Sequence, residues 1–149
     1  MAKTKGRILA LDVGERRVGI ALTDELRLTI RGLPTLVRKN RQTDLEALAT
    51  LIREHEVGLV VVGNPLHMSG EQSEQSGQAG RFAARLRARI QAPIELWDER
   101  LTSVEAEQSV RQRSGRAAAS REARKQAVDQ AAAVLILESY LNSKAQSSA

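Results

Sequence analysis

RILALDVGERRVGIALTD, residues 7–24, is the stretch that decides the fold. Its first apolar run, Ile8–Leu11, ends at Asp12, and a second run, Val18–Leu22, follows after Gly14. Two short β-rich runs around a glycine turn predict a β-hairpin. A carboxylate at the end of a buried strand costs free energy unless something neutralises it, so Asp12 is a candidate cation ligand. Stabilisation of the turn at Gly14 is the simpler alternative.

The overall composition is that of a globular protein. The chain has 149 residues, of which 42% are hydrophobic and 28% charged, which is typical of one folded domain with a real core. We expect that domain over residues 1–142 and a polar C-terminal tail over 143–149. With 2% aromatic residues, no Cys and two His, the sequence argues against base stacking on aromatic platforms, thiolate catalysis and Cys- or His-rich metal sites.

The charge and the N-terminus indicate the environment and the kind of partner. The net charge of +5 favours an anionic partner, although a mildly basic surface can also have no specific role. Residues 1–6 contain no apolar segment like that of a signal peptide, and no apolar run approaches the ~20 residues of a membrane span. We therefore expect a cytoplasmic protein that does not enter a membrane.

Downstream of the hairpin, the hydrophobic pattern alternates between strands and helices. Further strands are expected over residues 26–36, 57–63 and 93–98. Helices are expected over residues 43–55, 71–91, 102–113 and about 121–142. Three strands followed by helix, strand, helix, strand and helix predict an α/β fold, in which a central mixed five-stranded sheet carries helices on both faces.

Two details of these helices are also predicted. Thr43 precedes Glu46 as in a capping box, so we expect it to cap the first helix. The last helix should place Asp129 beside an inward-facing apolar stripe. That stripe is expected to comprise Val128, Ala131, Ala132, Leu135, Ile136 and Tyr140.

Carboxylates stand where strands are expected to end. Asp12 closes the first strand, and Asp98 and Glu99 close the strand over 93–98. In open α/β sheets, sites form at such strand ends. Hard divalent cations prefer oxygen ligands, and a pair of them can activate water and stabilise the leaving oxygen of a phosphodiester. Asp129 would complete a set of acids that needs neither His nor Cys.

Each of these acids also has an ordinary explanation. Asp98 and Glu99 can pair with Arg100, and Asp129 can answer Lys125 one turn earlier on the same helix. The same holds for the arginines that flank residues 114–120: they can contact phosphates or form a solvated basic surface. These arginines are Arg111, Arg113, Arg116, Arg121 and Arg124.

Four motifs in register carry a resemblance to a known family. They are Asp12-x-Gly14-x-x-Arg17-x-Gly19-x-Ala21, Val62-Gly63 with Pro65 and Met68-x-Gly70, Asp98-Glu99-Arg100-Leu101-Thr102, and Lys125-x-x-x-Asp129-x-x-Ala132-Ala133. In this combination the chain resembles the YqgF (RuvX) family of bacterial RuvC-like nucleases from about residue 7 to residue 141. The resemblance implies an RNase H-like fold and a nuclease that uses one or two Mg²⁺ or Mn²⁺ ions.

Residue roles follow from the resemblance. Asp12 would bridge the metal ions, Glu99 would be the strand-end ligand with Asp98 as the alternative, and Asp129 would be the acid on the helix. Arg17, Arg100 and Lys125 would face phosphates, together with the basic segment described above. The chain departs from the family in the loop over residues 64–71, where the usual acidic position is Ser69 and Asn, Leu and Thr positions are His67, Asn64 and Glu71.

The resemblance leaves the substrate open. The family is described as acting on the 5′ end of pre-16S ribosomal RNA and on Holliday junctions, so structured RNA and branched DNA are both expected partners, as is a ribosomal particle. A catalytically weak RNA-binding assembly factor is the alternative from another class. Actin-like ATPases share the first hairpin but need two such domains, which 149 residues do not hold. Both a monomer and a homodimer are compatible with the sequence.

Overall fold

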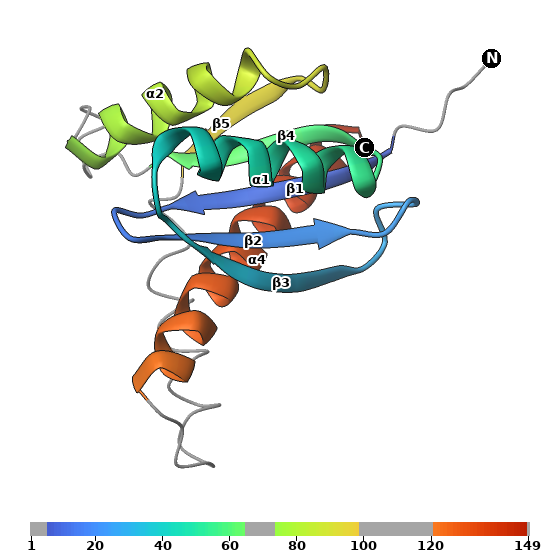
Figure 1. Cartoon of the computed structure of the whole chain (residues 1–149). Coiled ribbons are helices and arrows are strands. Elements are labelled where there is room, and N and C mark those ends of the chain that lie inside the picture. Colours follow the sequence, from blue (N-terminus) through green and yellow to red (C-terminus); the bar gives the residue numbers. More distant parts are fainter. Residues whose placement is uncertain (1–5, 65–73, 99–120, 149) are drawn as a thin grey trace.

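The computed structural model describes residues 6–64, 74–98 and 121–148, with the side chains of 74–76, 121–127, 129 and 145–148 left out (Figure 1). Its elements are β1 (Arg7–Val13), β2 (Arg17–Thr23), β3 (Ile30–Val37), α1 (Arg41–Glu54), β4 (Val57–Asn64), α2 (Glu74–Arg87), β5 (Ile94–Asp98) and α4 (Arg121–Ser148). The sheet order is β3-β2-β1-β4-β5. β1, β2 and β3 are antiparallel neighbours, whereas β4 and β5 run parallel to β1. The predicted mixed five-stranded sheet is confirmed.

Helices cover both faces of this sheet, as expected (Figure 1). On one face, α1 and α2 pack on a cluster that includes Leu9 and Leu11 of β1. On the other face, α4 packs on a cluster that includes Ile8 and Ala10. Successive side chains of a strand point to opposite faces, and β1 shows this alternation directly. Within the described residues, no helix is both long and apolar enough to cross a membrane.

A row of small residues lies where α4 crosses the sheet. Ala10 pairs with Ala21, and Ala21 pairs with Gly32, so the row spans β1, β2 and β3. A Cβ atom at Gly32 would lie 3.2 Å from the Cβ atom of Gln130 on α4. The Gln130 side chain also donates a 2.8 Å hydrogen bond from Nε2 to the carbonyl oxygen of Leu33. The small side chains therefore allow close packing of α4 on the antiparallel half of the sheet.

The structure corrects several local predictions. Asn40, not Thr43, caps α1: its side chain accepts a 2.9 Å hydrogen bond from the Thr43 backbone N–H. β3 begins at Ile30 and not near residue 26, because the Asp24 carboxylate accepts hydrogen bonds from the backbone N–H groups of residues 28 and 29 and so holds a turn there. The helix expected over 102–113 lies outside the described residues.

The inward face of α4 also differs from the predicted stripe. Val128 is 37% exposed, whereas Ala133 and Leu137 are fully buried. Every residue from 131 to 137 is apolar, so hydrophobic spacing alone does not determine which side faces the sheet. The predicted burial of Ala131, Ile136 and Tyr140 is confirmed. α4 continues to Ser148, beyond the predicted end near residue 142.

Tyr140 fastens the C-terminal half of α4 to β5. Its hydroxyl donates a 2.5 Å hydrogen bond to Oε2 of Glu95, and its ring meets that of Trp97 edge-on, with 5.3 Å between the ring centroids. Trp97 in turn donates from Nε1 to Oγ of Ser139 at 3.1 Å. Burial of the phenol, followed by the nearby Glu95 carboxylate, raises the pKa of Tyr140 to about 12.

This pKa predicts a loss of stability in alkali. The unfolded chain releases the tyrosine proton near pH 10, roughly the ordinary value, whereas the folded chain retains it until about pH 12. The contribution is therefore complete below pH 10 and is lost as the pH rises through that window. Urea denaturation of the wild type and of Tyr140→Phe at pH 8 to 11 should show a steeper decline for the wild type. Equal slopes for the two proteins would contradict the assignment.

Candidate active site at the carboxyl ends of the strands

Asp12 lies near the end of β1 on the face covered by α4. It follows Ile8 and Ala10 in the alternation, and both of these belong to the α4 cluster. Asp12 pairs with Gly19 of β2. Leu11 pairs with Val62 of β4, so Gly63 is the next neighbour on the other side. Both strand positions beside this half-buried carboxylate therefore lack a side chain.

Arg17 shares this face with Asp12. It alternates with Gly19 and Ala21 along β2, and Ala21 belongs to the α4 cluster. Because Asp12 pairs with Gly19, Arg17 occupies the diagonal position across the two strands. Diagonal neighbours in antiparallel pairs are about 7–8 Å apart, a separation that an arginine side chain can span. Arg17 and Asp12 thus lie on the same face of the sheet, on neighbouring strands.

Strand alternation indicates which face of the sheet Asp98, the last residue of β5, points to. Gly63 pairs with Trp97, and Asn64 pairs with Asp98, so β5 ends at the same edge as β1 and β4. Trp97 faces α4, as its bond to Ser139 shows. Asp98 follows Ile94 and Leu96 in the alternation, and Ile94 belongs to the opposite cluster. The carboxylate of Asp98 therefore points to the α1 and α2 face, away from the face of Asp12.

Position 129 lies on the part of α4 that packs on the sheet. It precedes the buried residues Ala133, Ile136 and Tyr140 by one, two and three turns of the helix. The corrected stripe therefore runs through position 129 and not beside it. In Figure 1, α4 crosses the sheet behind β2 and β3, and its N-terminal turns extend past the edge strand β3. The backbone at position 129 and the Asp12 carboxylate thus share one face of the sheet.

The remaining predicted site residues are not described at the level of contacts. Glu99, Arg100, Arg113 and Arg116 lie outside the described residues, and the side chains of Arg121, Arg124, Lys125 and Asp129 are not described on α4. Among the side chains that the structure does describe, no three acids or histidines gather as a metal site. The grouping of Asp12 with Glu99 and Asp129 therefore stays a prediction.

Sequence reasoning missed a cluster behind the turn that follows Asp12. Arg38 donates a 2.7 Å hydrogen bond from Nη1 to the carbonyl oxygen of Gly14, and its guanidinium lies 5.4 Å from the centroid of the Phe82 ring. Its Nε is 3.7 Å from Oδ2 of Asp44, which is only 2% exposed. Oδ1 of Asp44 accepts a 2.9 Å hydrogen bond from the backbone N–H of Lys39. The sequence feature that could have indicated this cluster is Asp44 itself, an acid directly before the first apolar residue of the α1 stripe.

Replacing Asp44 by Ala should destabilise the protein. The substitution leaves the Lys39 N–H without its acceptor and the Arg38 guanidinium without its ion-pair partner, which costs about 1–3 kcal/mol. Asp44→Asn keeps an acceptor and should lose less. Urea denaturation of both variants measures the difference. A loss for Asp44→Ala within about 0.5 kcal/mol, the usual range for surface changes, would show that the cluster adds no stability.

Gly14 is required by close approach and not by a left-handed backbone. Its N–H donates a 2.8 Å hydrogen bond to the carbonyl oxygen of Arg17, and a Cβ atom would lie 2.9 Å from that oxygen. The predicted reversal at Gly14 is thus confirmed. Together with the Arg38 bond, this contact fixes the turn on which the position of Asp12 depends.

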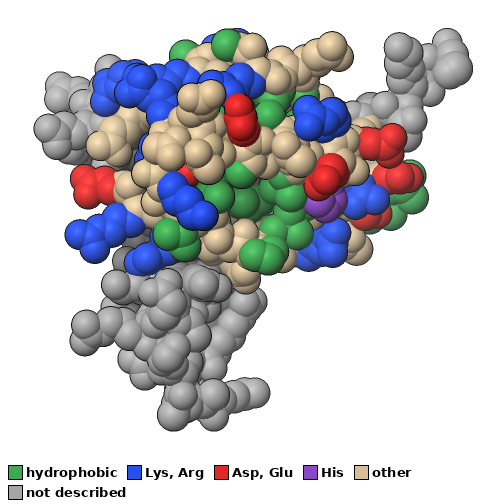
Figure 2. All heavy atoms as spheres, viewed as in Figure 1, with side chains coloured by type: hydrophobic (Ala, Val, Ile, Leu, Met, Phe, Trp, Pro, Cys, Tyr) green, Lys and Arg blue, Asp and Glu red, His purple; other side chains and the backbone are tan. Residues whose placement is uncertain are grey.

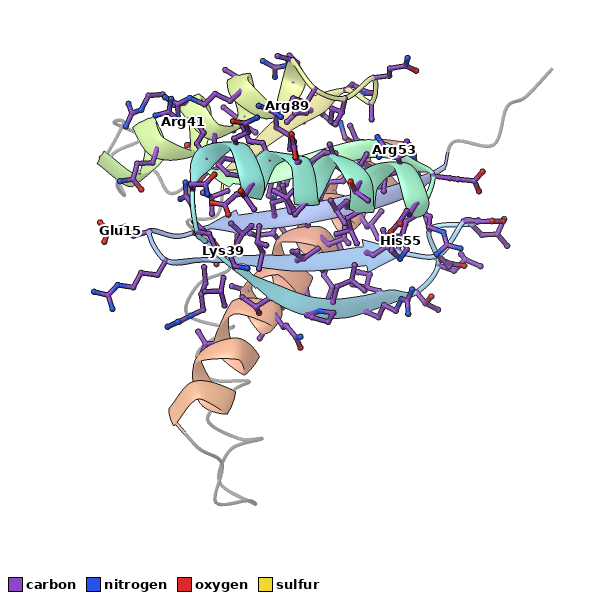
Figure 3. All side chains as sticks on the ribbon, viewed as in Figure 1. Glu15, Lys39, Arg41, Arg53, His55 and Arg89 are labelled. Atoms are coloured by element: carbon purple, nitrogen blue, oxygen red, sulfur yellow. The ribbon has the colours of Figure 1, made fainter. Side chains whose placement is uncertain are left out.

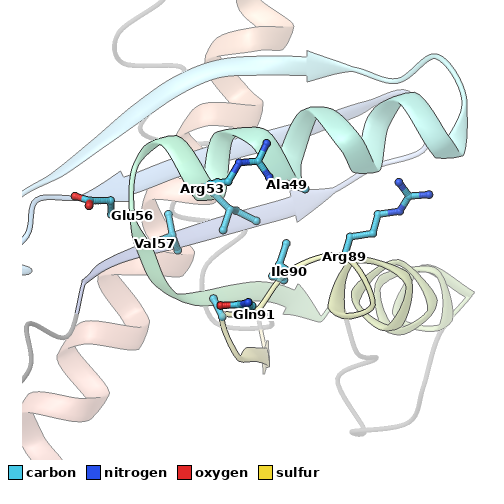
Figure 4. A pocket seen from close by; sticks show the side chains of 9 residues that line it. Ala49, Arg53, Glu56, Val57, Arg89, Ile90 and Gln91 are labelled. Carbon is cyan, nitrogen blue, oxygen red and sulfur yellow. The ribbon is translucent and has the colours of Figure 1, made fainter.

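A separate cavity of about 370 Å³ lies between the end of α1 and the connection from α2 to β5 (Figure 4). Its lining includes Arg53, Arg89 and Val57, the residue at which β4 begins. The cavity is therefore at the amino end of β4, whereas Asp12 is at the carboxyl end of the neighbouring parallel strand. It does not belong to the candidate active site.

A family model described as RuvX, Holliday junction resolvase, matches residues 6–143. The chain belongs to the RuvX family. A RuvX relative from Koribacter versatilis, named "Putative pre-16S rRNA nuclease", is 47% identical over 136 residues, which cover 91% of this chain and 86% of that protein. A relative of the same name from Syntrophus aciditrophicus is 44% identical over 140 residues, covering 94% of this chain and 91% of that protein.

Comparison with solved structures shows which fold the chain has. RuvC of T. thermophilus in complex with a Holliday junction substrate has a TM-score of 0.55 and 14% identity, with 91% of this chain and 96% of that chain covered. Fowlpox virus resolvase in complex with Holliday junction DNA has a TM-score of 0.57 and 12% identity, covering 92% of this chain and 97% of that chain. At such identities the likeness shows the fold alone, and it confirms the expected RNase H-like, RuvC-like architecture.

Proposed function

We propose that this RuvX-family protein is a nuclease that hydrolyses phosphodiester bonds with the help of divalent cations. The observation that carries the proposal is the position of Asp12 at a strand end, between two glycines and diagonal to Arg17. A carboxylate that is flanked by glycines can hold a metal ion, and a nearby arginine can bind a phosphate beside that ion. The names of the RuvX relatives support the same activity.

The residues fit a hard divalent cation. Asp12, Glu99 and Asp129 would supply carboxylate oxygens, the ligands that Mg²⁺ and Mn²⁺ prefer, and the chain contains no Cys that would favour a softer metal. When bound, the ions would activate water and stabilise the leaving oxygen of the phosphodiester. Arg17 would hold the phosphate against Asp12, and Arg100 and the basic residues from Arg113 to Lys125 would bind the substrate backbone.

The substrate favoured here is the 5′ end of pre-16S ribosomal RNA, which would place the protein in ribosome biogenesis in the cytoplasm, free or on a ribosomal particle. The names of the RuvX relatives support this choice. Branched DNA is the second candidate, favoured by the family description as a Holliday junction resolvase. A homodimer would suit that reaction, because a junction is cut at two symmetric positions. A monomer would suffice for trimming RNA.

One experiment tests activity and substrate together. The purified protein is incubated with a pre-16S 5′ fragment or a four-way DNA junction, in Mg²⁺, in Mn²⁺ and in EDTA. We expect metal-dependent cleavage of the RNA and little cleavage of the junction. Cleavage of the junction alone, by a dimer measured by mass in solution, would favour the resolvase. Salt-sensitive RNA binding with no cleavage in either metal would overturn the nuclease and favour an assembly factor.

A further inference from the structure

A basic hollow of about 490 Å³ opens beside the first turn of α1, and no role has been assigned to it. Cations from three segments line it: the connection between β3 and α1, the start of α1, and the outer face of α2. Figure 2 shows Lys and Arg side chains gathered over α2 and the start of α1. The four exposed cations that line the basic hollow are Lys39, Arg41, Arg81 and Arg85.

These four cations have no acidic partner within the part of the chain that the structure describes. By contrast, Arg89, two residues beyond the end of α2, has its Nη1 atom 3.8 Å from Oε1 of Glu46 on α1. Two acids line the basic hollow. Asp44 is buried and already accepts from Lys39 N–H beside Arg38, and Glu15 is exposed at the rim. The hollow therefore carries an excess of positive charge that attracts an anion.

The start of α1 adds to this potential. α1 begins at Arg41, directly after the cap residue Asn40, and both line the basic hollow. The N-terminus of a helix carries a partial positive charge from its free N–H groups. In Figure 3, Lys39 and Arg41 lie at this end of α1, and Glu15 extends outward from the β1–β2 turn. Side-chain and backbone charge thus have the same sign at one place.

The basic hollow is close to Asp12 along the chain but on the other side of the sheet. Glu15 lines the hollow and follows Asp12 by three positions, so their Cα atoms are at most about 11 Å apart. Arg38, also in the lining, holds the Gly14 carbonyl between them. A polyanion bound at Asp12 on the α4 face needs only to pass over the β1–β2 turn to reach the hollow on the α1 and α2 face.

We propose that the basic hollow binds the phosphate backbone of the nucleic acid that flanks the cleaved bond. The nature of the ligand rests on the proposed nuclease function. Contacts of this kind give affinity and salt dependence without reading sequence. The hollow would therefore select for length: a substrate that extends past the β1–β2 turn binds it, and a short one does not.

The test compares two triple variants that lose the same charge. The hollow variant loses three of the four exposed cations and is Arg41→Gln/Arg81→Gln/Arg85→Gln. The matched control loses three arginines on other surfaces and is Arg31→Gln/Arg53→Gln/Arg89→Gln. Fluorescence anisotropy measures binding of a long pre-16S fragment and of a short oligonucleotide that spans only the cleavage site, in EDTA and over a range of salt. Each neutralised phosphate contributes about −0.7 to −0.9 to the slope of log K against log salt.

We expect the hollow variant to bind the long RNA about ten- to a hundredfold more weakly at low salt, with a slope about two smaller in magnitude. The control should change little, and the short oligonucleotide should not distinguish the two variants. Equal losses for both variants, or equal losses on the long and short RNA, would overturn the proposal. So would binding of inorganic phosphate in the hollow with no effect on the long RNA. Thermal melting verifies that both variants fold.

Because binding is measured in EDTA, the result does not depend on cleavage. If the wild type cleaves nothing but the hollow variant loses affinity for the long RNA, the nuclease function fails and the binding surface stands. If the wild type cleaves and the two variants bind alike, the nuclease stands and the basic hollow has no part in it.

Discussion

Asp12→Asn should reduce metal-dependent cleavage by about 10²- to 10³-fold or more, the scale of losing one group that stabilises charge in a transition state. The amide keeps the size of the side chain but removes the negative charge that would hold a cation at the end of β1. Since Asp12 is only half-buried, the free energy of unfolding should change by less than about 1 kcal/mol. Single-turnover cleavage rates and urea denaturation measure the two quantities separately.

The matched control is Asp24→Asn. Asp24 directly follows β2, the second strand of the hairpin. Its carboxylate accepts hydrogen bonds of 2.6 and 2.9 Å from the backbone N–H groups of Leu28 and Thr29. These bonds, with that of Thr29 foremost, hold the pKa of Asp24 below its ordinary value, so Asp24 is an ionised acid near the end of β2. Cleavage by Asp24→Asn should equal that of the wild type. If Asp12→Asn cleaves as fast as Asp24→Asn, Asp12 does not hold the ion.

Glu99→Gln should impair cleavage about 100-fold or more, whereas Asp98→Asn should change it by less than about fivefold, because a ligand lost from a metal site affects the transition state directly. The expectation rests on β5, where Trp97 faces α4 and Asp98 faces α1 and α2. In an extended chain, the position after Asp98 returns to the face of Asp12. Both substitutions remove one charge, so each is the control for the other.

A second measurement guards against an indirect effect. Mn²⁺ that binds the folded protein raises its melting temperature, and this rise should be lost in Glu99→Gln and retained in Asp98→Asn. A large loss of cleavage in Asp98→Asn, together with loss of the Mn²⁺ effect, would show that the chain turns at β5's end so that Asp98 faces Asp12. Similar losses in both variants would indicate that the two acids share the ion.

The fold could be predicted because each strand and helix has a strong local signal. The hairpin predicted from the two apolar runs around Gly14 is confirmed, and its pairs run from Leu9 with Leu22 to Val13 with Val18. The run over residues 57–63 is buried on both faces because helices cover both sides of β4. Such patterns record burial, and burial decides the arrangement of layers.

The candidate site was harder to predict from the sequence, because it depends on which side of a helix faces the sheet and on contacts between residues that are distant in sequence. Nothing in the spacing around Ala133 fixes which side of α4 faces the sheet, so position 129 appeared beside the stripe and not within it. The Arg38 bond to Gly14 joins residues 24 positions apart. Asn40 caps α1 in place of Thr43 because the β3–α1 connection starts the helix at Arg41, directly after Asn40.

The row of Ala10, Ala21 and Gly32 is the surface on which α4 packs, and Gln130 is the α4 residue that lies against Gly32. Two ions that act on one phosphodiester must stand about 3.5–4 Å apart, so tenths of an ångström matter to the reaction. A methyl group added at Gly32 would lie 3.2 Å from the Cβ atom of Gln130, so Gln130, which is next to position 129 on α4, would have to shift by a few tenths of an ångström. If Asp129 and Asp12 hold the ions as proposed, side-chain volume at positions that touch neither metal nor substrate would affect the spacing of those ions.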